Sequence, residues 1–564
     1  MPTTEIEMWK SLFGYVNGGS SDGEELDWRY CGLDVWPIVK SQILMRGSNI
    51  YNAGRQMSLT KGAKQAPQSR PTFISRWRRA SRAVVPDRPA PTPKVMPNFD
   101  WPQLPRPEVA ADVICMGYAT NHKKLGNSHF QLCMDPLRLA LARADAGSVC
   151  LITGLDDVAD GIEHSAAKGV YGIERQFRAV RNLAKQMPPV ELKDFPGFAA
   201  WWDGLGKLLG NDMFVTVEHI ETVIQQTAVV GAWLKDYFAS TRPRIVLVSA
   251  YYGLIGHGGS WACRELGIPI ADVQHGVAGS NHHAYSWPNA PVSGFNTLPS
   301  GFLTWSEQEC AEMRKTSGAW SPDLLAIGNV WRLLDETLGS KDAADLFRPK
   351  ALATARDEVS KEHKAIAAVK EKSPGEKDIL LALHPDEPLP WFNRFKQLAP
   401  SEWRFWIRLH PGEFKNNEAL AKRLEAVCDE RTFVIEPSKA PLNVILSEVD
   451  AVLTKFSSVA LDARAYGVPT VAYSDAARIF FDSPEVHRIS FVPPFPERMR
   501  AALVQRLSDY RPAMKEIQPI EQFDVLGHKL IAALAGKPDR FAVGDLSSGL
   551  HRAGTEAAAV PARP

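Results

Sequence analysis

Two successive runs of short apolar segments, each alternating with helical segments, constrain the fold of this chain more than any other feature. In the first run, apolar strands are expected at residues 111–118, 149–153, 244–252, 268–273 and 302–305. In the second run, they are expected at residues 378–384, 403–410, 432–435, 451–454 and 470–473. Strands that alternate with helices form parallel sheets whose two faces are covered. The pattern therefore predicts an α/β protein with two Rossmann-like domains in series.

The length of the chain also indicates more than one domain, because hydrophobic cores rarely grow beyond about 300 residues and this chain has 564. We expect, in order, an N-terminal helical extension, a basic proline-rich linker, a first Rossmann-like domain, a helical connector, a second Rossmann-like domain and a disordered tail. Their predicted bounds are 1–52, 53–109, 110–330, 331–375, 376–536 and 537–564.

Composition and charge favour a globular protein without general affinity for nucleic acid. Hydrophobic residues make up 45% of the chain, charged residues 23%, and the net charge is +1, which is ordinary for globular proteins. Residues 53–95 depart from this average, with ten Lys or Arg residues and one acid, Asp87. Within them, residues 70–82 mix aromatic and basic side chains. This segment is either a solvated connector or a surface that contacts anionic lipid of the inner membrane.

Targeting and redox features predict a cytoplasmic protein. The N-terminus has no apolar leader, and no apolar run approaches the roughly 18 residues of a membrane span. The seven cysteines are scattered, without the paired spacing of a zinc site. If the basic segment binds lipid, the protein would lie at the inner face of the cytoplasmic membrane. We predict neither a metal ion nor a cofactor.

The familiar phosphate-binding loops are absent from both predicted domains. Neither GxGxxG nor GxxxxGK[ST] occurs there, which argues against dinucleotide-dependent redox chemistry and P-loop hydrolysis. Glycines do gather after the strand at 244–252, at Gly253, Gly256, Gly258 and Gly259. They permit either a close approach of backbone to a ligand or a turn from strand to helix.

Polar residues follow the strand at 268–273, in the order Asp272, Gln274, His275 and Gly276. Ligands of open parallel sheets bind beyond the carboxyl ends of the strands. A histidine at this position is either a satisfied structural residue, a general base or a donor to phosphate. We predict that His275 is catalytic, with Asp272 as a nearby carboxylate. Gln274, Gly276 and His282 are expected to line the same side of the site.

A second polar group ends the strand at 403–410. Alternation along a strand places Arg408 and His410 on one face, and Pro411 ends the strand before Gly412. A guanidinium and an imidazole that point the same way can bind the oxygens of one phosphate. The pair His384-Pro385 also follows a strand, so a His-Pro pair does not by itself define a site.

The third group is the turn that carries Lys455, Ser457 and Ser458 after the strand at 451–454. Serine here is either a helix N-cap or part of an anion site at a helix N-terminus. On neighbouring strands of one sheet, this turn and Arg408-x-His410 would together bind the phosphate of a ligand. Gly412 is expected to complete this donor site.

The motifs QHG at 274–276, HPG at 410–412 and SS at 457–458, taken together, resemble the bacterial GT-B glycosyltransferases that build capsule, lipopolysaccharide and related surface glycans. The HP and SS motifs also resemble GT-B sialyltransferases, and the HP motif resembles teichoic-acid glycerophosphotransferases. The combination of QHG and HP is most similar to the retaining β-Kdo transferases. The resemblance implies a GT-B fold with two Rossmann-like domains facing across a cleft. The acceptor would lie on residues 110–330 and the nucleotide-sugar donor on residues 376–536.

The same resemblance implies roles for individual residues. In these families the HP histidine and the SS hydroxyls contact the phosphate of a CMP- or CDP-linked donor, which carries over to His410, Ser457 and Ser458. The retaining Kdo transferases use an aspartate nucleophile in the N-terminal domain, for which Asp135 is a candidate by position.

We therefore expect a glycosyltransferase that moves a sugar from a nucleotide-activated, CMP-linked donor to a growing surface glycan or a lipid-linked acceptor. The first alternative is a CDP-polyol phosphotransferase of the teichoic-acid type. The second is a non-catalytic protein that binds or exports glycan, and the third is a nucleotide-sugar 2-epimerase.

Overall fold

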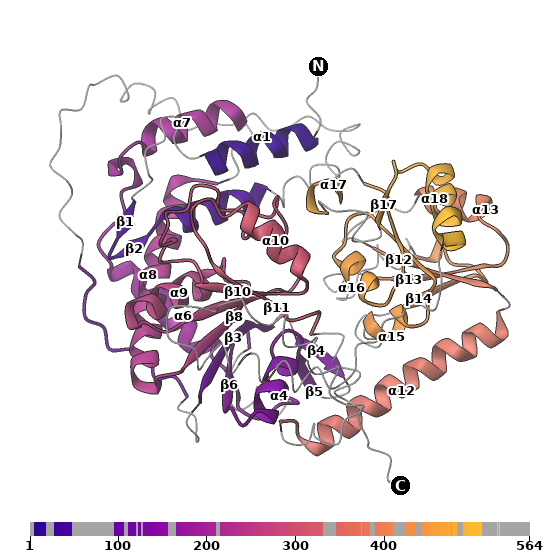
Figure 1. Cartoon of the computed structure of the whole chain (residues 1–564), viewed down its shortest axis with the longest axis horizontal. Helices are drawn as coiled ribbons and strands as arrows, with labels where there is room; N and C mark the ends of the chain where they lie inside the picture. Colours follow the sequence, from indigo (N-terminus) through magenta and orange to yellow (C-terminus); the bar gives the residue numbers. More distant parts are fainter. Residues whose placement is uncertain are drawn as a thin grey trace, which may run out of the picture.

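The computed structural model contains two parallel β-sheets that lie in separate lobes of the molecule (Figure 1). This topology confirms the predicted α/β fold with two Rossmann-like domains and a helical N-terminal region. The structure describes residues 5–18, 28–47, 95–105, 111–119, 122–125, 128–155, 165–209, 215–330, 346–373, 375–383, 390–409, 424–435, 442–474, 477–481, 489–509, 527 and 530.

The first sheet has seven strands in the order β11-β10-β9-β8-β3-β6-β7, all parallel. Their bounds are β3 (Val113–Tyr118), β6 (Ser148–Thr153), β7 (Val170–Gly172), β8 (Ile245–Ser249), β9 (Ile270–Val273), β10 (Gly301–Thr304) and β11 (Asp323–Ala326). A short antiparallel hairpin, β4 (His122–Leu125) and β5 (Ser128–Gln131), lies outside this sheet. Because the strands are parallel, the residues that follow β8, β9, β10 and β11 gather at one edge of the sheet.

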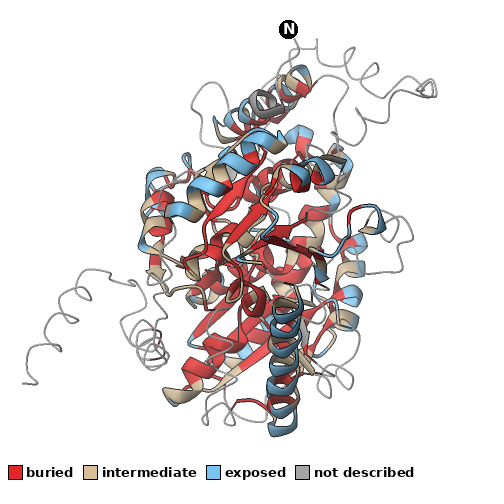
Figure 2. Cartoon of the chain, turned by 90° about the vertical axis from the view of Figure 1, so that its right-hand side faces the viewer, coloured by how far each residue is buried: buried red, intermediate tan, exposed pale blue. Residues whose placement is uncertain are grey.

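Helices cover both faces of the first sheet, and Figure 2 shows the strands as buried and the outer helix faces as exposed. The helices are α4 (Asp135–Arg143), α6 (Glu174–Leu183), α7 (Phe198–Leu209), α8 (Val217–Thr241), α9 (Leu254–Leu266) and α10 (Glu307–Lys315). The hydroxyls of Thr216 and Ser306 cap α8 and α10 by accepting from backbone N–H groups.

The glycines after β8 allow close packing around α9. Gly253 is the N-cap of α9, so it is the predicted turn from strand to helix, while the other three glycines lie inside α9. A Cβ at Gly258 would come within 2.8 Å of the backbone nitrogen of Gly231 in α8. Gly258 thus lets α8 and α9 approach each other closely, which is a use of glycine that the sequence prediction did not include.

The N-terminal segment packs into the core of the first lobe. It comprises α1 (Glu5–Gly18), the two-stranded β1 (Arg29–Tyr30) and β2 (Leu33–Asp34), and a helix over residues 36–47. Trp28 and Trp36 lie edge-on to Trp201 of α7, with ring centroids 6.0 and 5.2 Å away. The segment therefore shares one hydrophobic core with the sheet and its helices.

The second sheet has six parallel strands in the order β14-β13-β12-β15-β16-β17. Their bounds are β12 (Lys377–Ala382), β13 (Trp403–Arg408), β14 (Thr432–Ile435), β15 (Ala451–Thr454), β16 (Thr470–Ala472) and β17 (Ile489–Phe491). The helices of this lobe are α13 (Pro390–Leu398), α15 (Leu442–Leu446), α16 (Val459–Ala465), α17 (Ala477–Phe480) and α18 (Pro496–Asp509).

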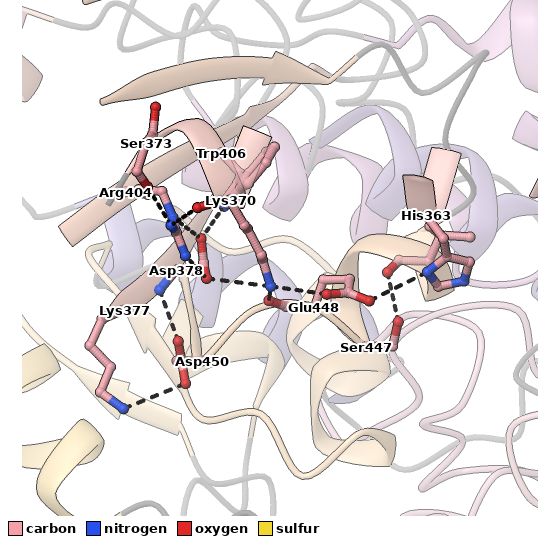
Figure 3. Close-up of polar contacts among 11 residues, drawn as sticks. His363, Lys370, Ser373, Lys377, Asp378, Arg404, Trp406, Ser447, Glu448 and Asp450 are labelled. Carbon is pink, nitrogen blue, oxygen red and sulfur yellow. Dashed lines mark hydrogen bonds and ion pairs between the residues drawn. The ribbon is translucent and has the colours of Figure 1, made fainter. Parts of the chain in front are cut away.

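A long helix, α12 (Pro349–Lys372), runs from one lobe to the other (Figure 1). Its first turns bury Ala351, Leu352 and Ala355 in a cluster of the first lobe, and Ile366 near its end is buried in a cluster of the second. Polar contacts then bind the end of α12 to the second lobe, where Lys370 pairs with Glu448 at 2.9 Å (Figure 3).

All ten predicted strands are present within three residues of their expected ends. The strands β7, β11 and β17 of the two parallel sheets, of three or four residues each, were not predicted. The predicted lipid-contact segment 70–82 and the predicted tail 537–564 lie outside the described residues. Among the helices that the structure describes, none combines the length and apolarity needed to cross a bilayer.

Candidate functional site between the two lobes

Gln274 shapes the loop that follows β9. Its side-chain nitrogen donates to the carbonyl oxygen of Gly276 at 2.9 Å and to Oε1 of Glu309 at 3.2 Å. Its side-chain oxygen accepts from the backbone nitrogen of Trp305 at 2.7 Å. The structure therefore places this predicted acceptor-side residue inside the protein, where it ties the QHG loop to the connection between β10 and α10.

His275 lies half-buried beside Tyr252, which sequence reasoning did not single out. The tyrosine hydroxyl and His275 Nε2 are 2.9 Å apart, and His275 Nδ1 is 3.4 Å from the carbonyl oxygen of Val273. Since a carbonyl can only accept, the tautomer that fits carries its proton on Nδ1 and accepts from Tyr252 at Nε2. Burial lowers the pKa of His275, so the ring is neutral at neutral pH and able to take up a proton.

Asp272 is fully buried at the end of β9. Oδ1 accepts from the backbone nitrogen of Tyr251 at 3.0 Å, and Oδ2 accepts from the Tyr285 hydroxyl at 3.0 Å. Burial raises the pKa of Asp272 to about 8, against the opposing effect of these hydrogen bonds. The carboxyl also accepts from the backbone of Ala250, whose φ of 59° is left-handed. Asp272 thus holds a constrained turn after β8, which positions Tyr252 for His275.

Asp135 is also fully buried, at the first residue of α4. It accepts from the backbone nitrogen of Gln131 at 2.8 Å and pairs with Arg138 at 3.4 Å. Burial raises the pKa of Asp135 to about 6, and the charge of Arg138 opposes that rise. Each carboxylate oxygen therefore has a partner within the first lobe. The structure gives Asp135 a clear part in closing the turn before α4.

On the second lobe, the structure corrects the predicted arrangement of the donor residues. β13 and β15 are not neighbours, because β12 lies between them and pairs with both. Arg408 and Thr454 are both in register with Ala382 of β12. The two groups therefore flank the carboxyl end of β12 at the same level. His410 and Gly412 lie outside the described residues, as does His384 after β12.

Arg408 is buried, with 9% of its surface exposed. Burial lowers its pKa to about 10, while the negative charge of Asp462 in α16 acts to raise it. Burial also raises the pKa of Asp462 to about 6, opposed by Arg408 and by Asn329, whose Nδ2 donates to Asp462 at 2.8 Å. Asn329 follows β11 of the first lobe, so this contact joins the two lobes beside Arg408. Neither Asp462 nor Asn329 was predicted, since no motif marks them.

The turn between β15 and α16 separates the roles of its two serines. The Ser457 hydroxyl accepts from the backbone nitrogen of Val459 at 3.3 Å, so it performs the capping role. Ser458 occupies the N-cap position, but its hydroxyl makes no capping hydrogen bond. The ammonium of Lys455 lies 5.4 Å from the ring centroid of Phe456. The N-cap interpretation therefore accounts for the hydroxyl of Ser457 but does not account for that of Ser458.

The loops after β9 and β10 meet the second lobe next to this turn. Val277, directly after the QHG motif, and Trp305 pack against a cluster that includes Ala460 and Leu461 of α16. The charge of Arg464 in α16 also acts on Glu309 in α10. The QHG and SS motifs, which are 180 residues apart in the chain, are thus brought together where the two lobes touch.

Comparisons with known proteins give distant structural similarities. The UDP-GlcNAc 2-epimerase of Neisseria meningitidis bound to UDP-GlcNAc is 15% identical, with a TM-score of 0.43, over 75% of this chain and 99% of that chain. The S. aureus MnaA–UDP structure is 13% identical, with a TM-score of 0.43, over 75% and 95%. The glycotransferase of kitacinnamycin is 13% identical, with a TM-score of 0.34, over 76% and 96%. No known family model matches the chain, and no curated protein matches it.

Proposed function

We propose that this protein is a glycosyltransferase that uses a nucleotide-activated sugar. The donor phosphate binds on the second lobe, between Arg408 and the turn of Lys455 and Ser458, and the acceptor binds on the first lobe beside His275. The observation that carries the proposal is the meeting of these two groups at the contact between the lobes, through Val277, Trp305 and α16. A transfer reaction needs its donor and acceptor on facing surfaces.

Electrostatics at Arg408 support an anionic ligand on the second lobe. Its guanidinium is buried and its pKa is lowered to about 10, although the charge of Asp462 is nearby. An anion that binds beside a buried cation offsets part of the cost of burying that charge. A guanidinium binds two phosphate oxygens at once, and its charge would stabilise the phosphate as it leaves the sugar. With Arg408 and Lys455 in these roles, the proposed mechanism needs neither a metal ion nor a cofactor.

His275 is the proposed base on the first lobe. Its neutral ring can take the proton of the acceptor hydroxyl at Nε2 once the Tyr252 hydroxyl gives up that position. The acceptor oxygen then bonds to the anomeric carbon, while the bond from that carbon to the donor phosphate breaks and its electrons leave with the phosphate. Asp272 acts through the turn that carries Tyr252 and is a positioning residue.

The resemblance of the three motifs supports a narrower version of the proposal. In that version the donor is linked to CMP and the acceptor is a surface glycan or a lipid-linked precursor of one. Polyol phosphate transfer would use the same phosphate site with a different transferred group.

Labelled donors test the proposal directly. The full chain is incubated with CMP-, CDP- and UDP-linked sugars and with CDP-glycerol, each with a glycan acceptor, and the product is analysed for the label. Transfer of a sugar supports the proposal, while transfer of glycerol phosphate alone would replace it with the polyol alternative. Calorimetry with the free nucleotides provides a second readout, and equal affinity for the wild type and Arg408→Gln would remove the donor site from the second lobe.

A further inference from the structure

A group of five basic side chains lies in and around the QHG loop of the first lobe, and we call it the histidine group. Its members come from four separate segments of the chain: the helix at 36–47, α9, the QHG loop and the loop that follows it. They are Lys40, His257, His275, His282 and His283. Sequence reasoning included His275 and His282 but not the group as a whole.

Aromatic contacts hold the group together. The rings of His282 and His283 stack with centroids 4.6 Å apart, and Tyr252 lies edge-on to His283 at 4.8 Å. The same Tyr252 binds His275 through its hydroxyl. The histidine group is therefore continuous with the proposed base of the reaction.

Lys40 is the most deeply buried member of the histidine group. It is buried, donates to the carbonyl oxygen of Ser286 and lies 3.7 Å from the ring centroid of Trp287. Its charge acts on both His282 and His283. A carbonyl and an aromatic ring solvate the ammonium without cancelling its charge, so a positive potential is available to whatever binds in front of it.

The described residues supply no carboxylate that offsets this group. Burial lowers the pKa of Lys40 and of each histidine, and the basic groups further lower the pKa of His282 and His283. The buried acid of this region is Asp272, and both of its oxygens accept hydrogen bonds from Tyr251 and Tyr285. The four histidines are kept neutral when the site is empty, because no described carboxylate stabilises their charged form.

Two of the imidazoles have nitrogens suited to an outside ligand. His283 has 8% of its surface exposed, and its Nε2 is buried without a hydrogen-bond partner among the described residues. His282 Nδ1 accepts from the backbone nitrogen of Ala284 at 3.2 Å, which leaves its proton on Nε2 as a donor. Buried polar atoms without partners cost free energy, so a ligand that accepts hydrogen bonds here is favoured.

We infer that the histidine group binds an oxyanion, a phosphate or a carboxylate that the acceptor carries next to its reactive hydroxyl. His282 and His283 donate to the anion, and Lys40 stabilises its charge from behind. That the anion belongs to the acceptor rests on the proposed function, because the histidine group lies on the His275 side of the reaction and away from Arg408. The substrate class would thus be an acidic glycan or a phosphate-linked lipid precursor.

Binding of an oxyanion should be accompanied by proton uptake. An anion raises the pKa of the histidines that face it, and their pKa values are lowered in the empty site. The titratable and charged groups around the site, on all the described elements packed there, are Lys40, Tyr118, Tyr251, Tyr252, His257, Asp272, His275, His282, His283 and Tyr285. Burial keeps the tyrosines protonated, so the histidines are the groups that gain protons.

Calorimetry with inorganic sulfate and with glucuronate tests the inference. Both ions stay fully ionised near neutral pH, so proton uptake reports on the protein, and the two arms separate a tetrahedral anion from a carboxylate. The titrations use the full chain with Arg408→Gln, which removes the donor site, in two buffers of different ionisation enthalpy. We expect binding whose heat depends on the buffer, and His282→Gln or His283→Gln should weaken it about tenfold, as the loss of a charged hydrogen bond does.

His363→Gln is the matched control, because this partly exposed histidine of α12 pairs with Glu448 on the second lobe. Lys40→Met tests the positive potential with a side chain of similar length. Equal affinity of the histidine variants and their parent, or heats that do not depend on the buffer, would overturn the inference. If nucleotide still binds the wild type through Arg408 in that case, the proposed function stands. Anion binding without any nucleotide binding would instead contradict the proposed function and the acceptor role of this site.

Discussion

Two arginines on the same strand show how differently the two ends of the second sheet are built. Arg404 starts β13 and Arg408 ends it, and both are buried on the same face of the strand. Arg404 donates two hydrogen bonds of 2.8 Å to Asp378 and further ones to the carbonyl oxygens of Lys370 and Ser373 (Figure 3). The hydrogen bonds to Asp378 raise the pKa of Arg404, whereas burial lowers the pKa of Arg408 to about 10.

The difference separates an end of the sheet that is held by ion pairs from the end where we propose the donor binds. Around Arg404, acids and bases alternate in a network in which Lys370, Asp378 and Glu448 each have an opposite charge within 3.4 Å. At the other end, Arg408 faces Asp462, whose pKa burial raises to about 6. A fully paired network stabilises one arrangement of α12 and the sheet, whereas a buried cation with a lowered pKa is a candidate for a binding site.

Arg404→Met should give the largest effect on stability. It leaves Asp378 as a buried charge without its main partner, which costs about 3–5 kcal/mol. Urea unfolding should show this loss, while nucleotide affinity of the folded protein stays at the wild-type value. Lys361→Met is the control, because Lys361 is an exposed residue of α12 whose ion pairs contribute little. A loss no larger than that of the control would show that the network does not stabilise the second lobe.

Arg408→Gln should give the opposite pattern. Removing Arg408 should lower the free energy of unfolding less than Arg404→Met does, because the pKa of its buried neighbour Asp462 is raised to about 6 and that carboxyl can take up a proton. The loss of charged hydrogen bonds to phosphate costs about 2–3 kcal/mol of binding. Calorimetry with the donor nucleotide measures the binding, and urea unfolding measures the stability. Arg394→Gln serves as control, because Arg394 is an exposed residue of α13. If Arg408→Gln lowered stability and nucleotide affinity by similar amounts, Arg408 would have a structural role like that of Arg404.

Tyr252→Phe tests the first lobe in the same way, with a smaller expected effect. The substitution removes the hydroxyl that binds His275 Nε2, so the ring loses its orientation at a cost of about 1 kcal/mol. We expect turnover to fall about fivefold to tenfold, as such a cost implies, with nucleotide affinity unchanged. Phe substitution at Tyr171, a half-buried tyrosine of β7, controls for loss of a hydroxyl elsewhere in the lobe. Wild-type turnover would exclude a role for the tyrosine in positioning His275.

The sequence was sufficient to predict both sheets because most of their strands are short, largely apolar segments that alternate with helical ones. Residues at strand ends, such as Arg408 and His275, could be placed at the correct edge for the same reason. The contact between Asp462 and Asn329 could not be predicted, because it depends on how the two lobes pack against each other. Lys40 was equally out of reach, since it lies over 200 residues before the histidines that it faces. Strand order also depends on long-range pairing, which explains why β12 was not expected between β13 and β15.

Asp462→Asn should give the smallest effect on nucleotide affinity, and it tests whether the charge of Asp462 limits what Arg408 can bind. The Asp462 carboxylate competes with a phosphate for the same guanidinium, and its pKa is raised from 3.8 to about 6. As pH falls through about 6, protonation of Asp462 removes that competition, so nucleotide affinity of the wild type should increase a few-fold. The raised pKa also means that the folded state binds this proton more tightly than the unfolded state. The contribution of Asp462 to stability is therefore greatest below pH 3.8 and declines as pH rises to about 6.

The asparagine variant keeps the hydrogen bond from Asn329 in reach and removes the charge. It should bind nucleotide a few-fold more tightly than the wild type at pH 7.5, with an affinity that no longer changes across the interval around pH 6. Calorimetry at pH 5.5, 6.5 and 7.5 measures both. Asp450→Asn, at the opposite end of the sheet beside Lys377, should leave the pH profile of binding unchanged. If Asp462→Asn also kept the wild-type pH dependence of nucleotide affinity, Asp462 would only hold Arg408 in place. The carboxyl end of β13 would then be a structural ion pair like its amino end.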